Sequence, residues 1–209
     1  KKAYDLLVQA ESGFLSITGT KSNLVKSGIS IADIAAGMHA FSAILAAIIE
    51  RGKSGKGSCI DISMLEAMVE WMGFPLFYAY DGASPPERTG SDHASIYPYG
   101  IFHTQERNVI LVGLQNEREW RTFCELILEQ PELTADLRFA DNAARSANRA
   151  ALREIIQNLF STLSSTEVCK KLDTAQIAFA KVNNMEEVWN HPQLKALNRI
   201  VSTHTPHGI

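Results

Sequence analysis

Apolar positions recur with a helical period through most of the first 80 residues. Residues 4–20 begin with an apolar run and end in a Thr-Gly-Thr turn, and residues 21–30 form a polar loop. Small and branched apolar residues then continue over about residues 30–51, which predicts a helix buried on most sides. Alternation over residues 59–63 predicts a short strand, and residues 64–80 predict a second apolar helix, ended or kinked near its proline.

The pattern changes after residue 80. The next stretch is rich in Pro, Gly and Ser, which predicts a linker or an active-site loop. Two strand-like runs at residues 99–104 and 109–114 then predict a β-hairpin. Farther along, we expect helices over residues 117–128, 148–164, 165–173 and 185–197, and a strand over residues 177–183. The predicted organisation is a helical part (1–80), a linker or flap (81–98) and a small α+β domain (99–209).

Composition narrows the class of partner. Hydrophobic residues make up 45% of the 209 residues, enough for a packed core, and the net charge is −3 with no basic cluster. A nucleic-acid or anionic-membrane partner would need a concentrated positive face, so neither is expected. The apolar helix comes nearest to a membrane span, but Asp33, Gly37 and His39 interrupt it.

Cysteine and histidine spacing predicts neither a disulfide framework nor a metal site. Cys59, Cys124 and Cys169 are odd in number and far apart, which favours a reducing cytoplasm. The histidines show no ligand spacing, and His93, in the predicted loop, is the one candidate near a site. The chain begins without a methionine and without a signal peptide, so we expect an internal segment of a longer protein, with its active site divided by the cut.

Asp33 is the most informative single residue, because it is the only charge between Lys26 and Glu50. One interpretation is structural: Ser30-x-x-Asp33 resembles a capping box, and an acid in a first helical turn gains about 0.3–1 kcal/mol from the helix dipole. The other is chemical: helix amides favour the ionised carboxylate, which can attack an activated acyl group. The pattern alone leaves both open and favours the cap.

A family resemblance bears on that choice. The segments YDLLVQAESGFLSITGT and SIADIAAGMHAFSAILAAIIERGKSGKGSCIDISMLEAM resemble class III CoA-transferases, the family that includes formyl-CoA transferase and carnitine CoA-transferase. The matching positions are Asp5, Gln9, Ala10, Ser12, Gly13, Asp33, Gly37, Arg51, Gly55, Gly57 and Asp61. Ser54 and Ser58 replace the family's usual Thr and Gln. The resemblance covers essentially the whole chain and implies an α/β fold, here the central helical part of the large domain plus the small domain with a short antiparallel sheet.

The resemblance also implies a mechanism. In such enzymes the aspartate that matches Asp33 attacks an acyl-CoA thioester, and CoA then passes through an aspartyl thioester to an acceptor carboxylate. Coenzyme A and acyl-CoA are substrates, and neither a metal nor a permanently bound cofactor is implied. The implied partners are small molecules and a second copy in an interlocked homodimer, with no nucleic acid or membrane. The large domain's CoA-binding part lies largely outside this chain, so we expect the segment alone to be inactive and to bind CoA weakly.

The family's glycine-rich flap corresponds to RTGSDHASIYPYG, where Gly90, Ser91 and His93 are the expected substrate-binding positions, together with Asn116 in the small domain. This flap keeps few glycines. Its polar sequence is similar to that of transferases for dicarboxylates such as itaconate, mesaconate or succinate.

Two alternatives stay open. An α-methylacyl-CoA racemase would use the aspartate as one half of an acid/base pair with a small-domain glutamate. That glutamate aligns with Asn116, although a one-residue shift would reach Glu117. The other alternative is a non-catalytic helical interaction module in which Asp33 is only a cap.

Overall fold

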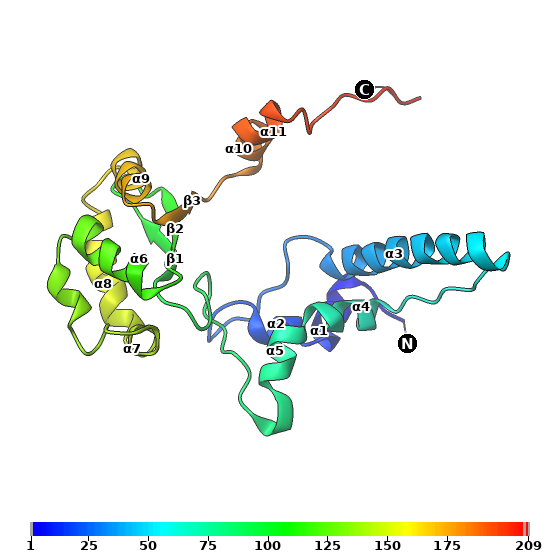
Figure 1. Ribbon diagram of the computed structural model, residues 1–209, viewed down its shortest axis with the longest axis horizontal. Coiled ribbons are helices and arrows are strands. Elements are labelled where there is room, and N and C mark those ends of the chain that lie inside the picture. The colour runs from blue at the N-terminus through cyan, green and yellow to red at the C-terminus, as the bar shows by residue number, and fades with distance from the viewer. Residues whose placement is uncertain (1, 207, 209) are drawn as a thin grey trace. The chain divides into compact units, whose positions relative to one another are not determined.

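The computed structural model describes residues 2–206 and 208 and divides into two compact units, Lys1–Ser95 and Ile96–Ile209 (Figure 1). The boundary between the units falls within residues 81–98, the stretch rich in Pro, Gly and Ser. Each unit is described by itself.

The first unit is helical. Its helices are α1 (Asp5–Glu11), α2 (Phe14–Ile17), α3 (Ile31–Ser54), α4 (Met64–Trp71) and α5 (Gly73–Tyr78), followed by a short 3₁₀ turn, η1 (Tyr80–Gly82). Helix α3 packs against α1 and α4 near its N-terminus. The small core there consists of Val8, Ala32 and Met68, against which Phe14, Ile31 and Met64 pack.

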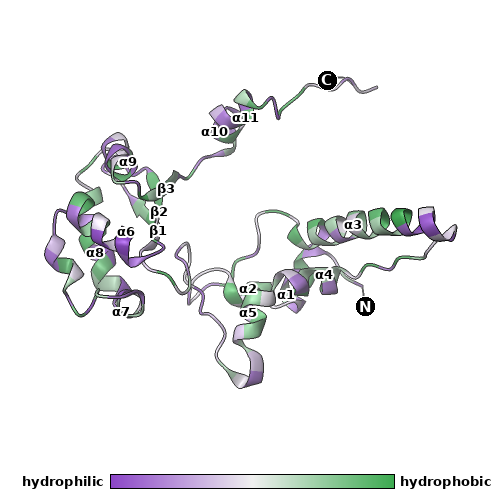
Figure 2. Ribbon diagram, in the orientation of Figure 1, coloured by the Kyte–Doolittle hydropathy of each residue, from purple (hydrophilic) through white to green (hydrophobic). Residues whose placement is uncertain are grey.

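Helix α3 extends well beyond this core. It ends at Ser54, and Gly55 follows at the C-cap position with a positive φ of 70° and donates its N–H to the carbonyl of Arg51. Hydrophobic residues recur along the helix in Figure 2. The exposed ones are Ile34, Met38, Phe41, Ile44, Leu45, Ile48 and Ile49. The expectation of a helix buried on most sides is therefore wrong for this chain.

By length and composition α3 could cross a membrane, although Asp33, Gly37 and His39 interrupt its apolar run as the sequence indicated. The residues around Gly37 and His39 carry no formal charge, so the helix stays strongly apolar despite these two positions. The core helix of a soluble protein meets the same two criteria.

Two local predictions in this unit need correction. Residues 59–63 form no strand, because a strand requires a hydrogen-bonded neighbour and the described part of the chain offers none there. The predicted 64–80 helix is divided between Trp71 and Gly73, close to Pro75 as expected. A proline has no N–H to donate to the preceding turn, so the break relieves a missing hydrogen bond.

The second unit contains a three-stranded antiparallel sheet of order β1-β2-β3. The predicted hairpin is confirmed: β1 (Tyr99–His103) pairs with β2 (Val109–Gly113), and β2 pairs in turn with β3 (Ala178–Lys181). The helical segments are α6 (Glu117–Thr122), the π-helical η2 (Phe123–Ile127), the 3₁₀ turn η3 (Pro131–Thr134), α7 (Asn142–Ala147), α8 (Arg149–Phe160), α9 (Ser165–Thr174), α10 (Met185–Trp189) and α11 (Pro192–Ala196).

The core of the second unit lies between this sheet and helices α6, α8 and α9. Leu152, Ile156 and Phe160 of α8 are fully buried and recur at helical spacing, which agrees with the helix expected over residues 148–164. Phe160 contacts Phe102 of β1 edge to face at 5.7 Å between ring centroids. Burying each such ring contributes about 1.5–3 kcal/mol, so α8 and β1 fix each other firmly.

Candidate active site at the N-terminus of helix α3

Asp33 lies in the first turn of α3, and its side chain is exposed in this chain. Its carboxylate accepts no hydrogen bond from any residue that the structure describes. Ser30 stands at the N-cap position, but its side chain makes no capping hydrogen bond. The predicted Ser30–Asp33 capping box is therefore wrong, and the carboxylate of Asp33 is left available.

The cap of α3 comes instead from α1. Asp5 accepts the N–H of Ala32 through Oδ1 at 2.9 Å, and it accepts Nε2 of Gln9 through Oδ2 at 2.7 Å. Gln9 is only 1% exposed, and its Oε1 accepts the N–H of Ser27 at 2.9 Å. A side chain distant in the sequence thus satisfies one of the helix's first N–H groups and fixes the turn that carries Asp33.

Small residues surround the carboxylate. Ala32 and Ala35 are buried, Ala32 against Val8 and Met68, whereas Gly37 is exposed. A Cβ built at Gly37 would meet no atom within 4 Å. These positions leave room above the first turns of α3 for a large substrate to approach.

His39, two turns into α3, belongs to a separate arrangement. Its Nδ1 lies 2.9 Å from the carbonyl of Ala35 and its Nε2 lies 3.0 Å from Oε2 of Glu70 on α4. A ring that donates from both nitrogens carries a positive charge. The Ala35 carbonyl accordingly raises the pKa of His39 most strongly, burial opposes it, and the Glu70 carboxylate raises it further, so that the net shift is upward. His39 clamps α3 to α4 and does not pair with Asp33.

The predicted flap positions lie in the same unit as Asp33. Gly90 has a positive φ of 70° and donates its N–H to the carbonyl of Gly19 at 2.7 Å. Nδ1 of His93 accepts the N–H of Ser95 at 3.2 Å. Ser91 is exposed. No hydrogen bond joins Asp33 to these three positions in the described chain.

Asn116, the fourth predicted substrate-binding position, lies in the second unit as the N-cap of α6. Its Oδ1 accepts the N–H of Glu119 at 3.0 Å, and its Nδ2 donates to Oε1 of Glu119 at 2.8 Å. Both ends of the amide are therefore used in capping, a role that its sequence context did not suggest.

The neighbouring Glu117 is held in a bidentate ion pair. Arg145, 3% exposed, donates to its two carboxylate oxygens at 2.8 and 2.9 Å. The same guanidinium donates to the carbonyls of Tyr97 and Phe139 and stacks over the ring of Trp120. Both carboxylate oxygens of Glu117, whose side chain is half exposed, are thus engaged by a buried guanidinium.

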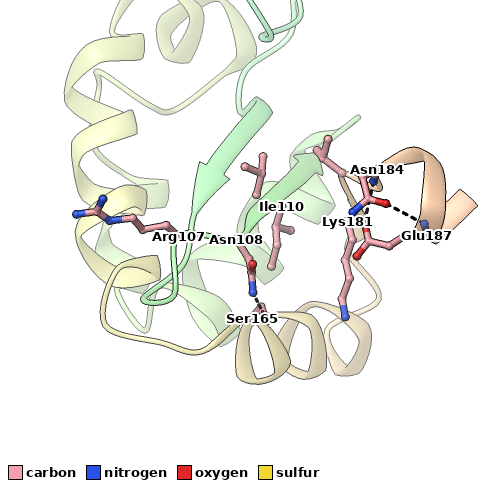
Figure 3. A pocket seen from close by; sticks show the side chains of 9 residues that line it. Arg107, Asn108, Ile110, Ser165, Lys181, Asn184 and Glu187 are labelled. Carbon is pink, nitrogen blue, oxygen red and sulfur yellow. Dashed lines mark hydrogen bonds between the residues drawn. The ribbon is translucent and has the colours of Figure 1, made fainter.

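A groove of about 380 Å³ crosses the second unit between β2, β3 and α10 (Figure 3). Most of its polar groups are paired with one another. Asn108 donates to Ser165 at 3.2 Å, and Asn184 and Glu187 form a reciprocal capping box at 2.7 and 2.9 Å. Within residues 2–206 and 208, no group of three or more His, Cys, Asp or Glu side chains could hold a metal ion.

Similarity to known proteins covers the entire chain. A family model described as "CoA-transferase family III" matches residues 1–209. A succinyl-CoA:glutarate CoA-transferase from Homo sapiens is 31% identical over 195 residues, 93% of this chain and 44% of that protein. A succinyl-CoA:mesaconate CoA-transferase from Haloarcula hispanica is 30% identical over 194 residues, 92% of this chain and 48% of that protein.

Solved structures of related proteins share the fold of this chain. A crystal structure of a CaiB/BaiF family protein from Brucella suis superimposes with a TM-score of 0.79 at 29% identity, covering 94% of this chain and 52% of that one. The chain thus spans about half the length of the proteins that it matches.

Proposed function

The chain belongs to the CoA-transferase family III, and from that premise we propose that its full-length protein moves CoA from an acyl-CoA donor to a dicarboxylic acid. The likeness to the Brucella suis structure confirms the predicted α/β fold class. The small antiparallel sheet of the second unit agrees with it.

In the proposed reaction Asp33 is the nucleophile. Its carboxylate oxygen attacks the thioester carbonyl, the C–S bond breaks, and CoA leaves as a thiolate, which gives a mixed anhydride. The thiolate then attacks the Asp33 carbonyl, releases the donor acid as its carboxylate and forms an aspartyl-CoA thioester. The acceptor carboxylate attacks that thioester, CoA leaves again, and attack of the thiolate on the acceptor's acyl carbon regenerates Asp33 and forms the new acyl-CoA.

One observation supports this assignment: Asp5 caps α3, so the carboxylate of Asp33 has no hydrogen bond to give up within the part of the chain that the structure describes. A nucleophile must approach the carbonyl carbon without breaking strong hydrogen bonds first. The positive end of the dipole of the 24-residue α3 also favours the negative charge that develops on the attacked carbonyl oxygen.

A dicarboxylate acceptor is the proposed substrate class. The relatives are named for glutarate and mesaconate, which both carry two carboxylates. In this chain Ser91 and His93 stand where the family has flap glycines, and polar side chains in the flap suit a substrate with a second carboxylate. Coenzyme A and its thioesters are substrates in this proposal, with no permanently bound cofactor. We further propose a cytoplasmic homodimer, and an inactive isolated segment.

The racemase alternative is disfavoured by a specific contact. It would require a small-domain carboxylate that can exchange a proton, yet Asn116 is an amide that caps α6 and Glu117 is held at both oxygens by buried Arg145. The non-catalytic alternative rests on Asp33 as a helix cap, and α3 is capped by Asp5 instead.

The test uses the full-length protein incubated with succinyl-CoA and quenched with hydroxylamine, followed by peptide mass spectrometry. A hydroxamate at Asp33 would support the covalent mechanism. An unmodified Asp33 in a protein that exchanges α-protons of a branched acyl-CoA would indicate a racemase. Absence of both signals would leave a non-catalytic protein.

A further inference from the structure

Arg88, the first residue of the flap, makes three hydrogen bonds to the backbone of the first unit. Its Nε donates to the carbonyl of Thr20 at 2.8 Å, its Nη1 to that of Ser16 at 3.2 Å, and its Nη2 to that of Lys21 at 3.0 Å. All three guanidinium nitrogens are thereby engaged with backbone some 70 residues away in sequence. The planar fork of arginine can bridge several acceptors in a fixed geometry, which a lysine ammonium cannot do.

Two of the three carbonyls that Arg88 contacts, those of Thr20 and Lys21, belong to a tight hairpin, residues 18–25, and the third, that of Ser16, belongs to α2 just before it. The N–H of Val25 donates to the carbonyl of Thr18 at 3.1 Å, and Thr20 and Asn23 exchange N–H···O bonds of 3.0 and 3.2 Å. A Cβ at Gly19 would stand 2.2 Å from the carbonyl oxygen of Asn23, so this turn has no space to spare. The hairpin is therefore a well-ordered element to which the start of the flap can be anchored.

The same hairpin leads into the nucleophile helix. Two residues after Val25, the N–H of Ser27 is held by the buried Gln9, and α3 begins at Ile31. On the flap side, the N–H of Gly90 donates to the carbonyl of Gly19. The hairpin thus accepts hydrogen bonds from Arg88 and Gly90 at the start of the flap. At its C-terminal end the chain continues to the turn that carries Asp33.

The adjacent ion pair does not share this role. Lys21 and Glu87 lie 2.7 Å apart, but their side chains are 80% and 72% exposed. Solvent screens such a pair, and exposed pairs contribute little to order. Arg88, by contrast, is partly buried and bonded to fixed carbonyls. Glu87 therefore offers a control for charge changes in the same segment.

We propose that Arg88 is a positioning residue that holds the flap in register with the N-terminus of α3. This rests on the proposed function. A flap held in place excludes water from the acyl intermediates; a released flap admits it. Water that attacks the mixed anhydride returns the Asp33 carboxylate and the donor acid, so that the net reaction becomes acyl-CoA plus water to acid plus free CoA.

The test compares transfer with hydrolysis in the full-length protein. Free CoA released from succinyl-CoA without an acceptor is measured by a thiol reagent, and CoA transfer to glutarate is measured alongside. We expect Arg88→Lys and Arg88→Met to raise the ratio of hydrolysis to transfer about tenfold or more, with KM for succinyl-CoA little changed. Glu87→Gln should leave the ratio at the wild-type value.

Several outcomes would overturn the proposal. An unchanged ratio in a folded Arg88→Lys protein would reject the role of Arg88, and so would an equal rise in Glu87→Gln. If neither Arg88 variant folds, hydrogen exchange of the Gly90 amide in the wild-type protein decides, because an unprotected amide would show that the segment is not held. Absence of any transfer by the wild-type protein would instead reject the proposed function, which keeps the two failures distinct.

Discussion

The two units differ in how completely they bury their own apolar residues. The core of the second unit has 19 buried residues among those described, whereas the central cluster of the first has three, and α3 leaves most of its length uncovered. The second unit therefore has what it needs to fold by itself. The first unit, which carries the proposed nucleophile, has apolar surface that we expect the remainder of the full-length protein to cover. The proposed nucleophile thus lies in the first unit, whereas the larger hydrophobic core lies in the second.

The largest expected effect separates chemistry from stability within the first unit. Asp33→Asn in the full-length protein should lower the rate of CoA transfer by about 10³-fold or more, because an amide is not a nucleophile toward a thioester. Its free energy of unfolding should change by less than about 0.5 kcal/mol, since the carboxylate accepts no hydrogen bond from the described chain. Activity assays and urea titrations check both, and a large loss of stability would restore Asp33 as a structural cap.

The second unit should show the opposite behaviour at Arg145. Arg145→Met removes a buried cation and leaves the carboxylate of Glu117 and the carbonyls of Tyr97 and Phe139 without their donor. Loss of one member of such a pair costs about 3–5 kcal/mol, here toward the lower end because Glu117 is half exposed. Urea unfolding of residues 96–209 measures it, with Arg118→Met, at an exposed position of α6, as the matched control.

Two glycines sharpen the comparison inside the first unit. Gly19→Ala places a Cβ 2.2 Å from the carbonyl oxygen of Asn23 at a φ of +111°, and should destabilise the hairpin by about 1–3 kcal/mol. Gly52→Ala, in α3 with no atom within 4 Å of the new Cβ, should stabilise the helix by about 0.5–1 kcal/mol. The thermal unfolding temperature of the full-length protein should fall in the Gly19→Ala variant and rise in the Gly52→Ala variant. Equal shifts in the two variants would contradict the tight packing of the hairpin.

A pH dependence is expected at the contact between α3 and α4. The pKa of His39 is raised by the carbonyl of Ala35 and by Glu70. A raised pKa in the folded state means that this contribution to stability is complete below the ordinary histidine value near 6.5 and is lost as the pH rises through the folded pKa. Unfolding measured between pH 5 and 9 should show this loss in the wild-type protein and not in His39→Gln. Identical profiles would exclude the clamp.

The smallest effect is a difference in thiol reactivity between the units. Cys124 is buried in the second unit, and burial raises its pKa to about 12, so the reactive thiolate is scarce near neutral pH. Cys59, in the first unit, is exposed in this chain. Iodoacetamide applied to the native 209-residue segment should modify Cys59 first, and rapid modification of Cys124 would show that the second unit opens more readily than its core suggests.

Local sequence patterns determined much of the second unit. The stripe that includes Leu152 and Ile156 follows the helical period, and the Ser164–Glu167 capping box joins residues three apart. Signals of this kind lie within one or two turns of the chain, so the sequence contains them in full. The position of Asp33 in the first turn of α3 was predictable for the same reason, and the family motifs around it identified the fold.

The tertiary structure decided which residues make the long-range hydrogen bonds, and these differ from what local sequence patterns suggest. Ser30 has the spacing of a cap, yet Asp5 reaches Ala32 across 27 residues and takes that place. Arg88 finds its three carbonyls 67 to 72 residues away, and Arg145 finds Glu117 28 residues away. Residues 59–63 alternate like a strand but lack a neighbour to pair with in the described chain. A hydrogen bond between distant residues depends on where the packed chain brings donor and acceptor together, and no local period records that.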